Sequence, residues 1–77
     1  MVLEKVRALV AEQFDAEEEE IGADTPLAEL GADAFDIAEL MAALADEFDI
    51  ELPPETAEDI VTVGDAAAAV RRNLSKG

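Results

Sequence analysis

The chain has 77 residues, and its 20 acidic and 5 basic residues give a formal net charge of −15. Its length fits one small domain over residues 1–77, near the size at which a single core is just sufficient. Cysteine and histidine are both absent, which excludes disulfides, thiolate metal sites and the commonest general base of enzymes. We therefore assign no catalytic residue and do not expect an enzyme.

The charge distribution indicates the kind of partner. All five basic residues lie near the two ends of the sequence: Lys5, Arg7, Arg71, Arg72 and Lys76. The acidic middle repels nucleic acid and anionic lipid and attracts basic patches on proteins. We expect basic protein partners, no nucleic acid or membrane partner, and a monomer. No apolar run is long enough to span a membrane and no leader precedes the fold, so we expect a cytoplasmic location or an organelle matrix.

The first expected element is a helix over Val2–Phe14. Its apolar residues recur at helical spacing and form one stripe: Val2, Leu3, Val6, Leu9, Val10 and Phe14. Lys5 and Arg7 fall outside this stripe and are interpreted as solvent-side charges. The acidic run Asp15–Glu20 should be mostly a solvated loop, because carboxylates at a helix C-terminus oppose the helix dipole. Ile21 should anchor that loop in the core.

A long connection follows, over residues 22–31. Pro26 suits a first helical position, so Leu27–Leu30 should form one short turn. Leu27 and Leu30 should then close one end of the bundle. Gly31 allows a sharp change of direction with a positive φ.

The central helix is expected over Ala34–Phe48, a segment without glycine or proline. Asp33 is a good N-cap residue, and Asp36 lies where an acidic side chain favours a helix start. At about 100° per residue, one apolar stripe should face the core. Its members are Ile37, Leu40, Met41, Leu44 and Phe48.

The opposite face of this helix predicts a docking surface. Phe35, Ala38 and Ala42 project away from the core stripe, beside Glu39 and Asp46. An aromatic side chain exposed among small residues and carboxylates is typical of a protein-binding surface. The alternative is that Phe35, one residue into the helix, folds back under the preceding loop.

The last third of the chain predicts two more helices. Pro53-Pro54 forces an extended turn, after which Glu55–Val61 can form a brief third helix anchored by Ala57, Ile60 and Val61. Thr62 begins the last helix, with Asp65 three residues on, close to a capping box. The inner face of that helix should consist of Val63, Ala66, Ala67, Val70 and Leu74. The predicted fold is all-α: a small antiparallel bundle of three main helices plus one short helix, with a long first loop.

A family resemblance rests on the start of the central helix. The segment Gly31–Asp36 reads G-A-D-A-F-D and resembles the G-A-D-S-L-D motif of acyl carrier proteins, of the fatty-acid-synthase type. The match continues at the same spacing through Glu39-Leu40, Ala43-Leu44, Glu47-Phe48 and Leu52-Pro53. The resemblance implies a carrier of acyl thioesters on 4′-phosphopantetheine. It also implies two kinds of partner, fatty-acid-synthesis enzymes and a phosphopantetheinyl transferase. Basic patches on these partners would contact the acidic surface of this chain.

Two sets of site residues follow, the first from the resemblance and the second from the helical projection of the central helix. The prosthetic group would be placed at position 34, with neighbours Asp33, Phe35 and Asp36. The partner surface would consist of Phe35, Asp36, Ala38, Glu39, Ala42 and Asp46. We assign no metal site, because no EF-hand loop can be placed and carboxylate pairs on helices gather cations only weakly by charge density.

One departure from the family decides the chemistry. Ala34 stands where the family has the serine that carries the prosthetic group, and alanine has no nucleophile. Ser75, near the end of the sequence, is the only serine, while Thr25, Thr56 and Thr62 are better explained as caps or turns. Two interpretations stay open. The chain is a fatty-acid-type carrier held in an unmodifiable apo form by Ala34 as an engineered block, or it is a natural binding module that docks on synthase-type partners and never carries an acyl group.

Overall fold

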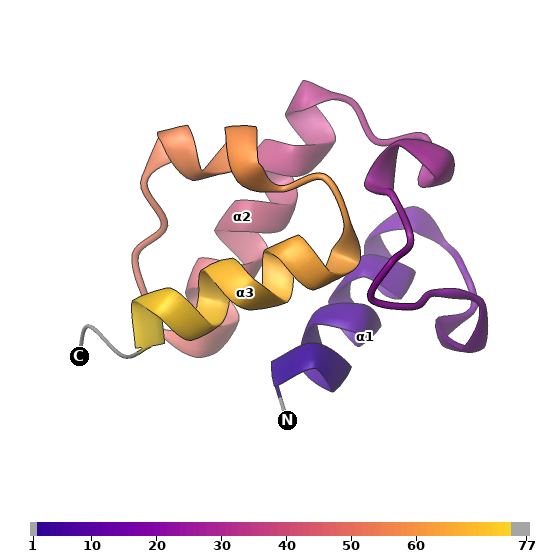
Figure 1. Cartoon of the computed structure of the whole chain (residues 1–77), viewed down its shortest axis with the longest axis horizontal. Coiled ribbons are helices and arrows are strands. Elements are labelled where there is room, and N and C mark those ends of the chain that lie inside the picture. The colour runs from indigo at the N-terminus through magenta and orange to yellow at the C-terminus, as the bar shows by residue number, and fades with distance from the viewer. Residues whose placement is uncertain (1, 75–77) are drawn as a thin grey trace.

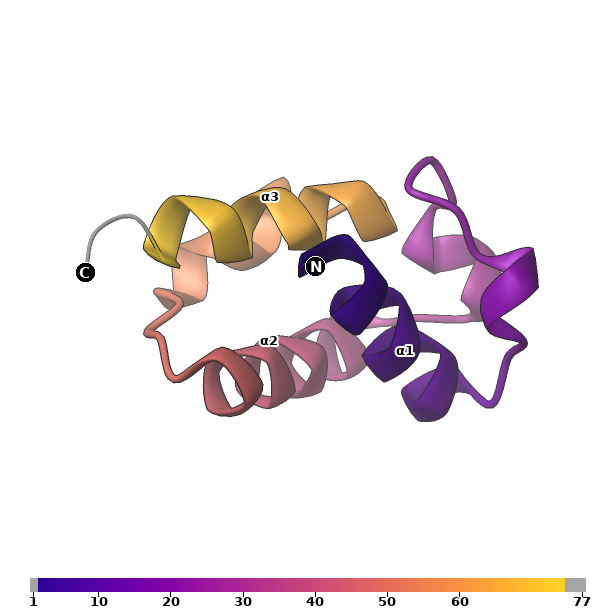
Figure 2. The same cartoon turned by 90° about the horizontal axis from the view of Figure 1, so that it is seen from below.

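The computed structural model describes residues 2–74. Three helices form the body of the molecule: α1 over Val2–Phe14, α2 over Ala34–Phe48 and α3 over Val63–Leu74. Three 3₁₀ turns lie in the connections: η1 over Glu18–Glu20, η2 over Leu27–Leu30 and η3 over Pro54–Asp59. In Figure 2, α2 and α3 run in the same direction and α1 runs against both. The predicted all-α bundle is confirmed, and within residues 2–74 no helix is long and apolar enough to cross a membrane.

The core lies between the three helices, whose arrangement Figure 1 shows. Each helix contributes side chains with no exposed surface, namely Val6, Val10, Leu40, Leu44, Val63 and Val70. Ile37 and Phe48 pack against this core at its edges. Ala11 and Ala69 are also buried, although the sequence analysis did not predict their burial. Burial of these apolar stripes is the main stabilising contribution in so small a domain.

The long connection is fixed to the helices from two sides. Ile21 and Leu27 are almost fully buried, as predicted. Arg7 was expected to be a solvent-side charge, and that expectation is wrong. Its guanidinium donates to the carbonyl of Ile21 at 2.8 Å and to that of Glu18 at 2.6 Å. α1 therefore holds the acidic segment in place through backbone carbonyls that the short turn leaves available.

The start of α3 holds the same connection from the other side. The N–H of Leu27 donates to the carbonyl of Val61 at 2.9 Å, and the N–H of Val63 donates to that of Thr25 at 3.0 Å. The N–H of Gly64 donates to the carbonyl of Ala23 at 2.8 Å. A Cβ at position 64 would lie 2.9 Å from that carbonyl oxygen, so this approach requires glycine.

The predicted burial of two residues in the last third of the chain, Val61 and Leu74, is wrong. The third short helix begins at Pro54 and ends at Asp59, so Val61 lies outside it, and the residue is 59% exposed. Its backbone is held by hydrogen bonds, because its N–H donates to the carboxylate of Asp65 and its carbonyl accepts from the N–H of Leu27. Leu74 is 43% exposed, because it lies in the last turn of α3, where the bundle opens.

Candidate functional site

The start of α2 is fixed by its turn and by its cap. Gly31 has φ +87°, which confirms the predicted turn, and Asp33 is extended at φ −112° and ψ −172°. The N–H of Asp36 donates to Asp33 Oδ1 at 2.9 Å, and the N–H of Asp33 donates to Asp36 Oδ2 at 3.1 Å. This reciprocal capping box fixes where the helix begins. The predicted cap at Asp33 is confirmed.

A residue from α1 also holds this helix start. Gln13 Nε2 donates to the backbone carbonyl of Asp36 at 2.9 Å. The two residues are 23 positions apart in the chain, and no local pattern connects them. Gln13 was therefore missed by sequence reasoning, since only the packing of α1 against α2 brings it to the site.

Position 34 is the first residue of α2, and its side chain is an exposed methyl group. Two threonine hydroxyl groups of the chain form hydrogen bonds in other turns and caps. Thr25 Oγ1 accepts from the N–H of Gly22 at 2.9 Å, and Thr62 Oγ1 accepts from that of Asp65 at 3.1 Å. Ser75 lies outside the described residues. The residues present at the helix start therefore do not fit a serine-linked prosthetic group, although the backbone setting is intact.

The predicted outer face of α2 is exposed. Phe35 is 82% exposed to solvent, so it does not fold back under the preceding loop. Ala38, Glu39, Ala42 and Asp46 are exposed as well. Asp36 is only half-buried and takes part in the capping box. Five of the six predicted partner-binding residues are thus exposed on α2, whereas Asp36 belongs to the cap at its start.

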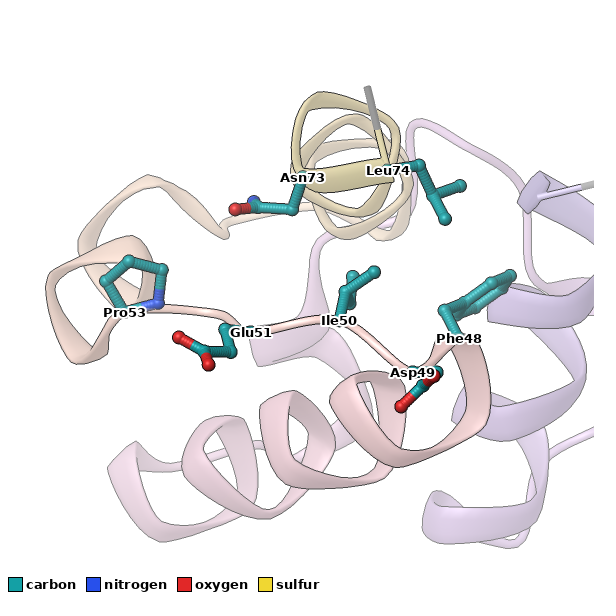
Figure 3. A pocket seen from close by; sticks show the side chains of 7 residues that line it. All are labelled: Phe48, Asp49, Ile50, Glu51, Pro53, Asn73 and Leu74. Carbon is teal, nitrogen blue, oxygen red and sulfur yellow. The ribbon is translucent and has the colours of Figure 1, made fainter. Parts of the chain in front are cut away.

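Two concave regions flank α2. A groove of about 320 Å³ lies between α2 and the segment that includes η3, and its lining is mostly apolar: Ala38, Met41, Ala42, Ala45, Leu52, Pro54 and Ala57. A larger cleft of about 720 Å³ lies at the other end of α2 (Figure 3). Sequence patterns identified neither, because a groove depends on how far apart neighbouring elements are held.

The carboxylates of this surface are dispersed. Within residues 2–74, no group of three or more carboxylates stands close enough to hold a metal ion. The pKa of the Asp65 carboxyl group, at the start of α3, is lowered from its ordinary value. The backbone N–H groups of Thr62 and Val61 donate to it, in that order of effect, and lower its pKa, while burial opposes them. This group belongs to a helix cap and lies outside the α2 surface.

Comparison with known proteins identifies the family. A family model described as the phosphopantetheine attachment site matches residues 4–70. The chain is also similar to a solved structure described as the NMR structure of the HMG-ACPI domain from the CurA module from Lyngbya majuscula. That match has 21% identity and a TM-score of 0.80, and it covers 99% of this chain and 78% of that chain. At this identity the structural match shows the fold alone. The family model covers most of the chain, and the chain therefore belongs to the phosphopantetheine attachment-site family.

Proposed function

We propose that this member of the phosphopantetheine attachment-site family is a fatty-acid-type carrier domain in an unloadable form. Its partners would be fatty-acid-synthesis enzymes and a phosphopantetheinyl transferase, each with a basic patch opposite α2. The proposal rests on the motif Gly31–Asp36 and on the acidic helix that follows it. A location in the cytoplasm or an organelle matrix belongs to the same proposal.

The observation that carries the proposal is the geometry at position 34. The capping box between Asp33 and Asp36 holds this residue at an exposed helix start. Phe35 projects into solvent beside it. A helix N-terminus offers unpaired N–H groups and a partial positive charge, which favour a phosphodiester at that place. Only the side-chain oxygen is missing.

The test is the variant Ala34→Ser. A side chain at this exposed position packs against little, so we expect stability to change by less than about 0.5 kcal/mol. Incubated with coenzyme A and a phosphopantetheinyl transferase, the variant should gain one prosthetic arm by intact mass. The parent chain, treated in parallel, is the matched control and should gain none. Its position 34 has no hydroxyl group, and its only serine, Ser75, lies outside the motif Gly31–Asp36.

Two outcomes would contradict the proposal. A folded Ala34→Ser variant that is not modified would show that more than the nucleophile has been lost. Modification of the parent chain would show that the attachment site is not position 34.

A second candidate function is a natural binding module that docks on synthase-type partners and never carries an acyl group. Ala34 itself favours it, because the rest of the helix start is retained without the one reactive atom. The codon at position 34 in the native gene separates the two candidates. A serine codon would support the blocked carrier, whereas an alanine codon would support the binding module.

A further inference from the structure

The segment that leads into α2 has few anchors of its own in the core. Residues 28–39 include no buried side chain, and the first buried side chain of α2 is that of Leu40. The members that pack partly against the core are Leu30, Ala32 and Ile37. The capping box joins Asp33 and Asp36 to each other, so it sets the shape of the first turn but not its place on the bundle. That place depends on a contact with another element.

Gln13, near the end of α1, supplies such a contact. Its Nε2 donates to the backbone carbonyl of Asp36 at 2.9 Å, and the side chain is half-buried. Within residues 2–74, this is the one hydrogen bond that joins residues 28–39 to α1, η3 or α3. A carbonyl oxygen has two lone pairs, so it can accept this donor in addition to the helical N–H four residues on. The contact therefore leaves the hydrogen bonds of α2 itself in place.

We propose that Gln13 is a positioning residue for position 34, because it holds the first turn of α2 against α1. Asp36 follows position 34 in the same turn and closes the capping box. A hydrogen bond to its carbonyl therefore fixes the direction in which position 34 and Phe35 face a partner. Glutamine suits this role, since its amide donates without adding charge to a surface that attracts basic partners. The consequence for modification of a serine at position 34 rests on the proposed function.

The first test measures amide hydrogen exchange by NMR in the full chain with Ala34 in place, so it does not depend on the proposed function. Gln13→Met removes the donor and keeps a side chain of similar length. The N–H groups of Asp36 and Ile37 donate within the first turn, to Asp33 Oδ1 at 2.9 Å and to the carbonyl of Asp33 at 3.0 Å. Both should exchange about fivefold faster or more in the variant, because local opening of this turn no longer has to break the bond to Gln13.

Asn73→Leu is the matched control. Asn73 Nδ2 also donates to a backbone carbonyl, that of Ala69 at 2.8 Å, but both residues belong to α3. Opening of the first turn of α2 does not break that bond, so the variant should change exchange at Asp36 and Ile37 less than about twofold. Equal acceleration in both variants, or no acceleration in Gln13→Met, would overturn the proposal.

The second test separates the hydrogen bond from charge. Gln13→Glu keeps the shape of the side chain, adds an acidic charge and has no donor when ionised. In the Ala34→Ser background, Gln13→Glu and Gln13→Met should each lower kcat for the phosphopantetheinyl transferase about threefold or more. KM should change less than about twofold, because the exposed face of α2 is unaltered. An added acidic charge by itself would favour a basic partner, so an unchanged or higher kcat for Gln13→Glu would overturn the proposal.

The two tests fail separately. If Ala34→Ser is folded and is not modified, the proposed function is wrong, and hydrogen exchange still decides the role of Gln13. If Ala34→Ser and its double variant with Gln13→Met are modified with the same kcat, Gln13 does not position the site, and the proposed function stands.

Discussion

Individual carboxylates in this chain stabilise the fold through hydrogen bonds, and Asp65 is an example. Asp65 accepts hydrogen bonds from the N–H groups of Val61 at 3.1 Å and Thr62 at 3.0 Å. Its own N–H donates to Thr62 Oγ1 at 3.1 Å. This is the predicted capping box at the start of α3. It also closes the turn through which Val61 and Thr62 pair with the long connection, so the cap stabilises two elements.

The pKa of Asp65 makes this cap dependent on pH. The folded-state pKa is lowered, chiefly by the hydrogen bonds from Thr62 and then from Val61. The stabilisation is therefore fully present above the unfolded-state pKa of about 3.9, and it is lost as pH falls through the folded-state pKa. Asp65→Asn should lower the free energy of unfolding at pH 7 by about 1 kcal/mol. The variant and the parent should approach each other only as pH falls through the lowered folded-state pKa of Asp65.

Urea unfolding at pH 7 and at pH 2.5 measures this difference. Asp46→Asn is the matched control, because it removes an exposed charge that caps no helix. The control should be neutral or slightly stabilising at pH 7, since it relieves repulsion. A loss for Asp65→Asn that is the same at both pH values would show that the charge of Asp65 contributes nothing to the cap.

At the scale of the element, α2 divides cleanly into two faces. Leu40 and Leu44 have no exposed surface, whereas Phe35 is almost fully in solvent. Helical periodicity predicted this division, because side-chain direction along a regular helix is fixed by residue spacing. It did not predict that Asp36 would close a capping box. Asp36 therefore serves the helix start itself, and a charge change there would disturb both folding and docking.

A cleaner test of docking uses two exposed residues of α2 that cap nothing. In the Ala34→Ser background, the double change Glu39→Lys with Asp46→Lys should lower kcat/KM for the phosphopantetheinyl transferase at least tenfold. It should also flatten the dependence of that rate on salt, because steering by the acidic face is lost. The matched control is Glu17→Lys with Glu19→Lys, which makes the same change in net charge on an exposed segment away from α2.

The control should lower kcat/KM less than threefold. If both pairs reduce the rate equally, the enzyme responds to net charge and α2 is not the docking face. Thermal melts of all variants check that the fold is retained.

Across the whole molecule, the features that sequence predicted are the local ones. The bounds of α1 and α2, the turn at Gly31 and both caps follow from spacing and from residue types within a few positions. What was missed depends on distant parts of the chain. Arg7 reaches the carbonyls of Glu18 and Ile21, and Gln13 reaches Asp36. Local patterns contain no signal for such contacts.

The same reasoning explains the errors at the ends of elements and the missed cleft. Val61 and Leu74 are apolar and lie at or near helical spacing, so periodicity placed them in the core. Whether such a residue is buried depends on how far the neighbouring elements extend, and here they stop short. The start of α2 was predictable because its residues are contiguous. The cleft between the ends of α2 and α3 was not, because it joins residues 48–53 to residues 73–74.

The balance of charge over the molecule should make its stability depend on salt. Every acidic residue except Glu4 lies between residues 12 and 65, where the chain has no basic residue. Repulsion among these carboxylates destabilises the compact state. Raising NaCl from 10 to 200 mM shortens the Debye length from about 30 Å to about 7 Å. The melting temperature should therefore rise by roughly 5 °C, equivalent to about 1 kcal/mol for a domain of this size.

A variant with Glu17, Glu18, Glu19 and Glu20 all changed to Gln provides the matched comparison. Arg7 contacts this segment through the backbone carbonyl of Glu18, so the side-chain changes leave that hydrogen bond in place. The variant should melt higher than the parent at 10 mM NaCl, and the two melting temperatures should converge as salt increases. MgCl₂ at matched ionic strength should raise the parent's melting temperature further, through weak binding to carboxylates. If the melting temperatures of both proteins do not change with salt concentration, the carboxylates are too far apart to repel one another measurably.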